Sequence, residues 1–243
     1  MKRLLHILLF LLTPIFSFAD QAGIDTVLDN IGEVVEPRLM TRFEQAMVTY
    51  PPKRVQLIAL KQSRRLELWA YDGTRWQFVH DYPIFAASGE KGPKLREGDK
   101  QVPEGFYRIV ELNPNSHFHL SMKLNYPNSF DWLQAAKEGR KQPGSNIFIH
   151  GSAWSAGCLA VGNRYVEELF YLVAKVGVEN ADVLIAPYDF RGRGVQLNAD
   201  TPEWVRTLYA YLNLRLASFP LSEKSLSCAQ GCSAARIGRK DVN

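Results

Sequence analysis

The chain has 243 residues and a formal net charge of +4 at pH 7, with 29 lysines and arginines against 25 acidic residues. This near balance lacks the basic excess that nucleic-acid binding requires, so no nucleic-acid partner is expected. The length is sufficient for one substantial domain with its own core.

The N-terminus predicts a secretory signal peptide. Lys2 and Arg3 precede an apolar run over residues 4–18, and the small side chains of Ser17 and Ala19 favour cleavage after Ala19. The run is short for a membrane span, and an uncleaved amphipathic or spanning helix is the alternative. We therefore expect a periplasmic protein with no stable membrane insertion after cleavage. Its 27 basic and 25 acidic residues would leave a net charge of +2.

After the signal peptide, the pattern of apolar residues predicts a helix followed by many short strands. The helix covers Asp25–Thr49 and ends before Pro51. The expected strands are 55–60, 66–71, 76–85, 106–112, 118–124, 147–150, 159–161 and 183–186. Asp72-Gly73 predicts a tight hairpin turn. So many strands with few intervening helices favour a mixed or antiparallel sandwich over a doubly wound sheet.

Two further helices are expected in the second half of the chain. The first covers Arg164–Val176, with Asn163 as its cap and Gly177 at its end. The second opens at Thr201-Pro202-Glu203. The predicted division is a signal peptide (1–19), an N-terminal helical segment (20–52), a strand-rich domain (53–190), a C-terminal helical extension (191–222) and a flexible tail (223–243).

The strand that ends at His150 is followed closely by the turn Ser155-Ala156-Gly157-Cys158. A neighbouring imidazole can take the proton of a thiol and return it later, so the pair predicts a cysteine nucleophile with its base. Gly151 lets the backbone approach a neighbour closely, and the N–H groups of Gly157 and Cys158 are candidate oxyanion donors. Ser155 either stabilises this turn or contacts the substrate.

The other cysteines and histidines have alternative interpretations. In an oxidising compartment Cys228 and Cys232 are close enough in sequence to form a disulfide, which leaves Cys158 unpaired. His117 and His119 share one face of the expected strand, but no carboxylate completes a recognisable set of metal ligands. We therefore expect no metal, and His119 is a candidate to orient the base or contact substrate.

Three segments together resemble the YkuD-type L,D-transpeptidase catalytic domain over residues 54–187: His150-Gly151, the turn from Ser155 to Cys158, and Gly98–Gly105. The segment 119–128 looks most like the YafK-like branch. The resemblance implies a mainly β, α+β fold, a β-sandwich of mixed sheets with flanking N- and C-terminal helices. It also implies a cofactor-free peptidoglycan enzyme whose cysteine attacks the bond after the L-centre of meso-diaminopimelate in stem peptides. Carried over, Cys158 is the nucleophile and His150 the general base.

The chain departs from the family pattern at two positions. Ala156 stands where typical members have a histidine, and Ala160 where they have an arginine. The connection from His150 to Cys158 is also short, so hydrolysis that releases a wall-linked lipoprotein or a D-amino acid is an alternative to transpeptidation. A non-catalytic peptidoglycan-binding module is a third. Lys91, in a loop rich in glycine and lysine, and Trp154 are candidates for substrate contact, with a solvated hairpin as the alternative for Lys91.

Overall fold

The computed structural model describes residues 22–197 and 201–221. The predicted signal peptide and the Cys228–Cys232 pair lie outside the described residues. Within them, no helix has the length and apolar character to cross a membrane.

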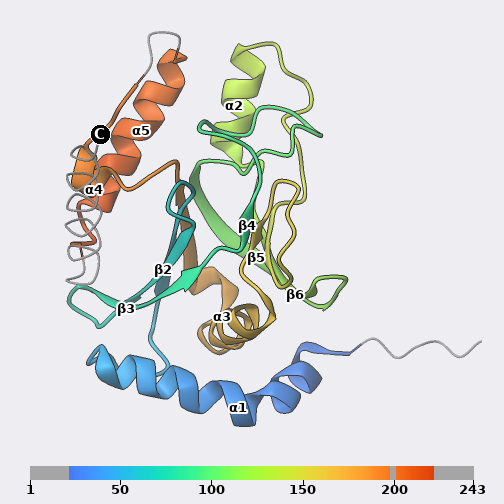
Figure 1. The fold of residues 1–243 in the computed structure, drawn as a ribbon, viewed down its shortest axis with the longest axis vertical. Helices are drawn as coiled ribbons and strands as arrows, with labels where there is room; N and C mark the ends of the chain where they lie inside the picture. Colours follow the sequence, from blue (N-terminus) through green and yellow to red (C-terminus); the bar gives the residue numbers. More distant parts are fainter. Residues whose placement is uncertain (1–21, 198–200, 222–243) are drawn as a thin grey trace, which may run out of the picture.

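The centre of the fold is a mixed sheet whose strands follow the order β3-β2-β1-β9-β5-β6-β7-β8-β4 (Figure 1). Two adjacent pairs, β1–β9 and β7–β8, are parallel, and the other pairs are antiparallel. With helices flanking it, this sheet confirms the predicted α+β class. The strands are β1 Val55–Leu60, β2 Arg65–Tyr71, β3 Trp76–Pro83, β4 Ala86–Ala87, β5 Gly105–Ser116, β6 His119–Leu124, β7 Phe148–His150, β8 Leu159–Ala160 and β9 Ala181–Ala186.

The long strand β5 joins the two halves of the sheet. Its first residues, Gly105–Arg108, pair with β9, whereas the rest of the strand pairs with β6. The sequence predicted its end at Leu112, but the hydrogen-bonded ladder continues to Ser116 opposite His119. This extension places the β5–β6 turn beside the end of β7, because β6 also pairs with β7.

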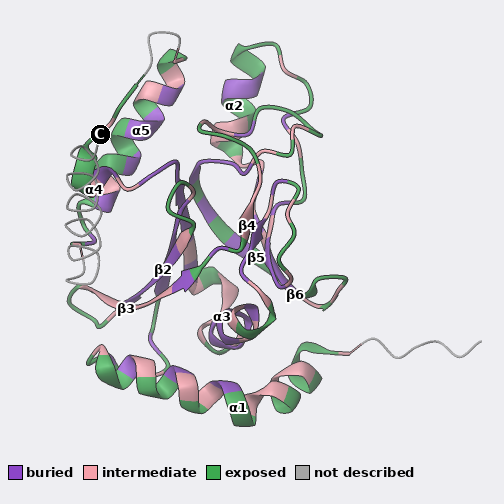
Figure 2. Ribbon diagram, viewed as in Figure 1, coloured by how far each residue is buried: buried purple, intermediate pink, exposed green. Residues whose placement is uncertain are grey.

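Strand β1 is buried along its whole length. Leu57 and Ala59 face the larger core, which also contains residues of α1 (Ile24–Gln45) and α3 (Asn163–Val176). Ile58 and Leu60 face a second core with α4 (Phe190–Arg193) and α5 (Glu203–Leu216). The strands in the middle of Figure 2 are accordingly buried. Coverage on both faces explains why β1 reads as an unbroken apolar run rather than an alternating one.

The helix boundaries differ from expectation where glycine and capping residues decide them. Helix α1 ends at Gln45 because Met47 adopts a positive φ of 56°. Helix α3 ends at Gly177 as predicted, but its N-cap is Gly162, so the prediction of Asn163 as the cap is wrong. The Asn163 side chain instead accepts a hydrogen bond from the Ser152 N–H.

Four short elements were not expected: strand β4, helix α2 (Ser129–Lys137), the 3₁₀ turn Val178–Asn180 and helix α4. Helix α2 begins with a capping box, in which Asn128 and Asp131 each accept a backbone N–H of the other. At the start of α5 the proline, Pro202, occupies the N-cap rather than the first helical position. The predicted hairpin after β2 forms, with the Asp72 carboxylate accepting from the Thr74 and Arg75 N–H groups.

Candidate active site

The two predicted reactive residues lie at the ends of the connection between the adjacent strands β7 and β8. These strands run parallel, with His150 opposite Ala160. His150 is the last residue of β7, and Cys158 directly precedes Leu159, the first residue of β8. The short connection predicted from sequence is therefore the turn between two adjacent strands.

The imidazole of His150 is buried, with 2% of its surface exposed. Its Nδ1 lies 2.6 Å from the Gly151 carbonyl oxygen, which can only accept a hydrogen bond, so Nδ1 carries the hydrogen and Nε2 keeps its lone pair. Burial lowers the pKa of His150, although the bond to Gly151 opposes the shift. The ring is therefore neutral at neutral pH and has the protonation state of a base.

The Cys158 thiol is also neutral at rest. Burial raises its pKa, while a backbone N–H at Phe148 and the charge of Lys94 act in the opposite direction. The Sγ atom lies 3.8 Å from the Asn146 carbonyl oxygen, a weak acceptor for its proton. The neutral states of the thiol and of the imidazole favour proton transfer during the reaction over a resting ion pair.

The turn before Cys158 is held by two serine hydroxyls. Ser155 Oγ accepts the Cys158 N–H at 3.2 Å and donates to the Cys158 carbonyl at 2.6 Å. Ser88 Oγ accepts the Gly157 N–H at 2.6 Å. These bonds favour the turn-stabilising interpretation of Ser155. They also occupy both predicted oxyanion donors, so an oxyanion would have to displace the two hydroxyls.

Gly151 sits where no side chain fits. Its N–H donates to the Leu120 carbonyl, and a Cβ added to it would lie 2.4 Å from the Phe118 carbonyl oxygen. The same Cβ would lie 2.7 Å from Asn163 Oδ1. The β5–β6 turn and α3 are therefore in close contact with Gly151, whose carbonyl accepts a hydrogen bond from the His150 imidazole.

An aromatic stack leads from the imidazole to the surface. The Phe118 ring lies over His150 with 4.5 Å between centroids and an interplanar angle of 30°. Trp154 stacks on the Phe118 ring with 6.2 Å between centroids, and Trp154 is 62% exposed. Phe118 was not identified from sequence, because its contact with His150 depends on the pairing of β6 with β7.

Two other candidates from the sequence, His119 and Lys91, have partners elsewhere in the structure. His119 Nε2 pairs with Glu167 Oε1 at 2.6 Å on α3, and the Nδ1 partner of His150 is the Gly151 carbonyl. Lys91 lies 5.5 Å from the ring centroid of Tyr188, beside a cavity that neither Cys158 nor His150 lines. Within the described residues, no group of three His, Cys, Asp or Glu side chains is arranged to hold a metal ion.

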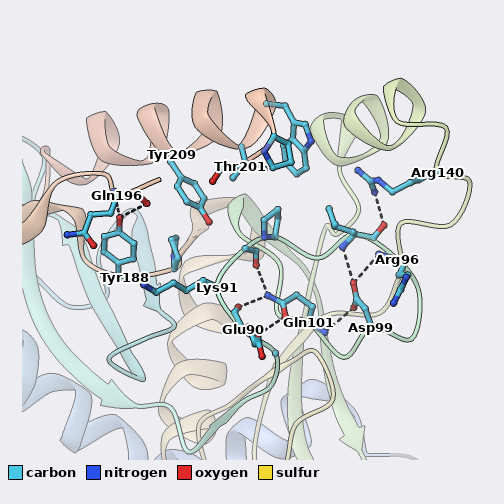
Figure 3. A pocket seen from close by; sticks show the side chains of 18 residues that line it. Glu90, Lys91, Arg96, Asp99, Gln101, Arg140, Tyr188, Gln196, Thr201 and Tyr209 are labelled. Atoms are coloured by element: carbon cyan, nitrogen blue, oxygen red, sulfur yellow. Dashed lines mark hydrogen bonds between the residues drawn. The ribbon is translucent and has the colours of Figure 1, made fainter. Parts of the chain in front are cut away.

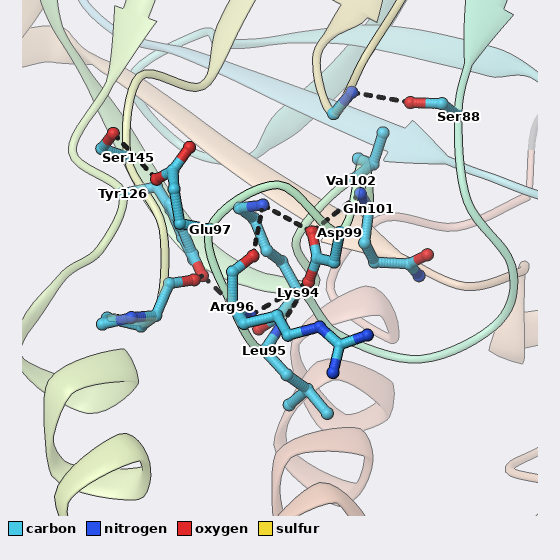
Figure 4. Close-up of polar contacts among 12 residues, drawn as sticks. Ser88, Lys94, Leu95, Arg96, Glu97, Asp99, Gln101, Val102, Tyr126 and Ser145 are labelled. Carbon is cyan, nitrogen blue, oxygen red and sulfur yellow. Dashed lines mark hydrogen bonds and ion pairs between the residues drawn. The ribbon is translucent and has the colours of Figure 1, made fainter. Parts of the chain in front are cut away.

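The loop between β4 and β5 is fixed by a buried ionic network (Figure 4). Asp99 accepts from Lys94 Nζ at 2.5 Å and from the N–H groups of Leu95 and Arg96. These bonds hold the pKa of Asp99 below its usual value, although burial acts to raise it. The Gln101 carbonyl oxygen of this loop is 3.4 Å from a Cβ built on Gly157, so the loop supports the cysteine turn.

Comparison with known proteins gives a consistent result. The family model of the L,D-transpeptidase catalytic domain, YkuD, matches residues 54–185. YafK of Escherichia coli (strain K12), which carries a provisional designation as an L,D-transpeptidase, is 30% identical over 194 residues, 79% of this chain and 72% of YafK.

The solved structures are more distant. The helical cell shape determining protein Pgp2 from Campylobacter jejuni is 21% identical with a TM-score of 0.47, and the match covers 68% of this chain and 56% of Pgp2. Bd1075 of Bdellovibrio bacteriovorus is 22% identical with a TM-score of 0.42, over 70% of this chain and 57% of Bd1075. The chain therefore spans little more than half of these two proteins.

Proposed function

Because the chain belongs to the YkuD family of L,D-transpeptidase catalytic domains, we propose that it modifies peptidoglycan by acyl transfer through Cys158. The proposed substrate is the stem peptide, cleaved after the L-centre of meso-diaminopimelate, and the proposed location is the periplasm, which the predicted signal peptide supports. The observation that supports the proposal is the buried imidazole of His150, held through Nδ1 by the Gly151 carbonyl, with Cys158 at the other end of the connection between β7 and β8.

In the proposed first step, the Cys158 thiol proton passes to His150 Nε2 while Sγ attacks the carbonyl carbon of the scissile bond. The C–N bond then breaks, and the departing amine takes the proton from Nε2, which leaves a thioester on Cys158. In the second step an acceptor amine attacks the thioester and gives its proton to Nε2, from which the proton returns to the released thiolate. The Gly151 carbonyl stabilises the imidazolium form in both steps.

The N–H groups of Gly157 and Cys158 are the proposed donors to the oxyanion. They serve this role only if the substrate displaces the Ser88 and Ser155 hydroxyls that now accept from them. Trp154 is a proposed contact for the substrate, because its exposed ring continues the stack that covers His150.

Hydrolysis of the same thioester is the alternative outcome. Ala160 is fully buried opposite His150, so this position presents no cation to a substrate carboxylate, in contrast to the arginine of typical members. The amine that departs in the first step would be a D-amino acid or a wall-linked lipoprotein, and water in place of an acceptor amine would then release the stem peptide from Cys158 with a free carboxyl group.

The test is a product assay with the purified protein, tetrapeptide muropeptides and lipoprotein-linked sacculi, read by mass spectrometry. We expect a thioester adduct on Cys158 and a loss of turnover of at least about 10³-fold in Cys158→Ala. The matched control is Cys228→Ala/Cys232→Ala, which keeps Cys158 as the only thiol and should retain turnover. Cross-linked dimers indicate transfer, and freed lipoprotein together with stem peptides that end in a free carboxyl group indicates hydrolysis. Turnover that survives in Cys158→Ala, or the absence of any adduct and product, would refute the proposal.

A further inference from the structure

A cavity in the described part of the chain lies away from the thiol. It has a volume of about 970 Å³, and neither Cys158 nor His150 lines it. One wall is the loop Gly89–Gln101, and the other comes from Tyr188 and from Trp204 and Tyr209 of α5 (Figure 3). This volume lies at the upper end of the range of small-ligand sites.

The polar atoms of the aromatic side chains around the cavity already form hydrogen bonds within the protein. Tyr209 OH donates to Glu104 Oε2 at 2.6 Å, and Trp204 Nε1 donates to Glu138 Oε1 at 2.6 Å. Tyr188 OH accepts the Gln196 N–H at 2.5 Å. These residues therefore offer carbon surface to a ligand, and its polar groups must be recognised by other side chains.

The charges available in the cavity are predominantly positive. Asp99 is already neutralised by Lys94, and Arg140 is paired with Glu138 at 2.6 Å. Among the described residues, neither Lys91 nor Arg96 has a carboxylate within ion-pair distance, and Glu90 is the one lining acid without a cation. Within the described chain, the cavity therefore has two cations without an ion-pair partner, Lys91 and Arg96, and one such acid, Glu90.

The position of these cations adds to the argument. In Figure 3, Lys91 lies beside Tyr188 on one side of the cavity, and Arg96 lies near Arg140 on the other. The first turn of α5, with Trp204 and Val205, forms part of the wall between them. The N-terminal end of a helix carries partial positive charge, so it also favours an anion there.

We propose that this cavity is a second binding site, distinct from the thiol site, for a short peptide that carries at least two carboxylates. The separated cations match separated carboxylates, and the carbon surface of the rings matches the aliphatic parts between them. Taking the peptidoglycan stem peptide as this ligand rests on the proposed function. The site also supplies the carboxylate recognition that buried Ala160 does not.

The loop Gly89–Gln101 lines the cavity and also contacts the turn that precedes Cys158. The Gln101 side chain lines the cavity and bonds to Glu90 and to the Gly92 carbonyl, whereas its own carbonyl lies against Gly157. A peptide in the cavity would therefore lie directly behind the segment that supports the cysteine turn.

The test measures binding without turnover, in the full chain carrying Cys158→Ala. The probe is the tetrapeptide L-Ala-γ-D-Glu-meso-diaminopimelyl-D-Ala, compared with the same peptide bearing amidated carboxylates. Calorimetry gives affinity, and the Trp204 indole N–H signal in ¹H–¹⁵N spectra, assigned with Trp204→Phe, reports on the cavity itself. Lys91→Ala/Arg96→Ala is compared with Lys53→Ala/Arg75→Ala, which removes the same charge from exposed positions elsewhere.

We expect the tetrapeptide to shift the Trp204 signal in a saturable way and the amidated peptide to leave it unchanged. The Lys91/Arg96 variant should lose at least about tenfold in affinity, and the control pair should bind like its parent. An unmoved Trp204 signal, or equal affinities in the two double variants, would overturn the inference. Because turnover is measured separately in the protein with Cys158 intact, failure of the cavity inference and failure of the proposed reaction are distinguishable.

Discussion

Replacing Gly151 by alanine places a methyl group 2.4 Å from the Phe118 carbonyl oxygen and 2.7 Å from Asn163 Oδ1. Neither oxygen can yield easily, since one belongs to the backbone and the other accepts the Ser152 N–H. The backbone angle at Gly151 is not in the left-handed region, so steric overlap is the whole cost. Overpacking of this kind lowers the free energy of unfolding by about 1–3 kcal/mol.

The same displacement moves the carbonyl that holds His150 at 2.6 Å. A shift of about 1 Å in a catalytic group typically costs about 10²-fold in rate, so the loss in kcat should exceed what the lower stability explains. The control is Gly192→Ala, where an added Cβ meets nothing within 4 Å. Urea unfolding and the product assay measure both effects. If Gly151→Ala matches Gly192→Ala in stability and in kcat, the close packing around Gly151 does not position the His150 imidazole.

Two further predictions concern Asp131 and Phe118. Burial raises the pKa of Asp131 to about 6, so the folded protein binds this proton more tightly than the unfolded chain, whose carboxyl has a pKa of about 3.9. The stability present below about pH 4 is lost as the pH rises to about 6, by at most about 3 kcal/mol, and urea titrations should show this slope flattened in Asp131→Asn. An unchanged slope would assign it to other groups. Phe118→Leu keeps apolar bulk but removes the ring stacked on His150, so kcat should fall about tenfold while the free energy of unfolding changes by less than about 1.5 kcal/mol. A normal kcat would show that the stack does not position the base.

The sequence was most informative where burial imposes one simple pattern. The unbroken apolar run of β1 and the wide apolar face of α3 were recognised because each segment packs into the core along its length. Helix α2 was missed because it is short and exposes Trp132 and Leu133, which obscures its periodicity. Its Asn128–Asp131 capping box was the available signal.

The site was predictable only as far as local sequence reaches. His150 and Cys158 are joined by one short connection, so the pair can be recognised from local sequence. The Ser88 hydroxyl that accepts from Gly157 and the Phe118 ring over His150 arrive through pairings between distant strands and loops. Such contacts depend on sheet register, which one sequence does not specify at these positions.

Helix α5 covers the second core, so it limits how far the chain can be shortened from its C-terminal end. The family match ends at residue 185, whereas Ile58, Leu60 and Leu184 pack against side chains between Tyr188 and Phe219. An expression fragment trimmed to the matched segment would expose these apolar side chains to water as one continuous surface. Such a surface favours aggregation. The end of the family match and the end of the unit that keeps both cores covered are therefore different places in this protein.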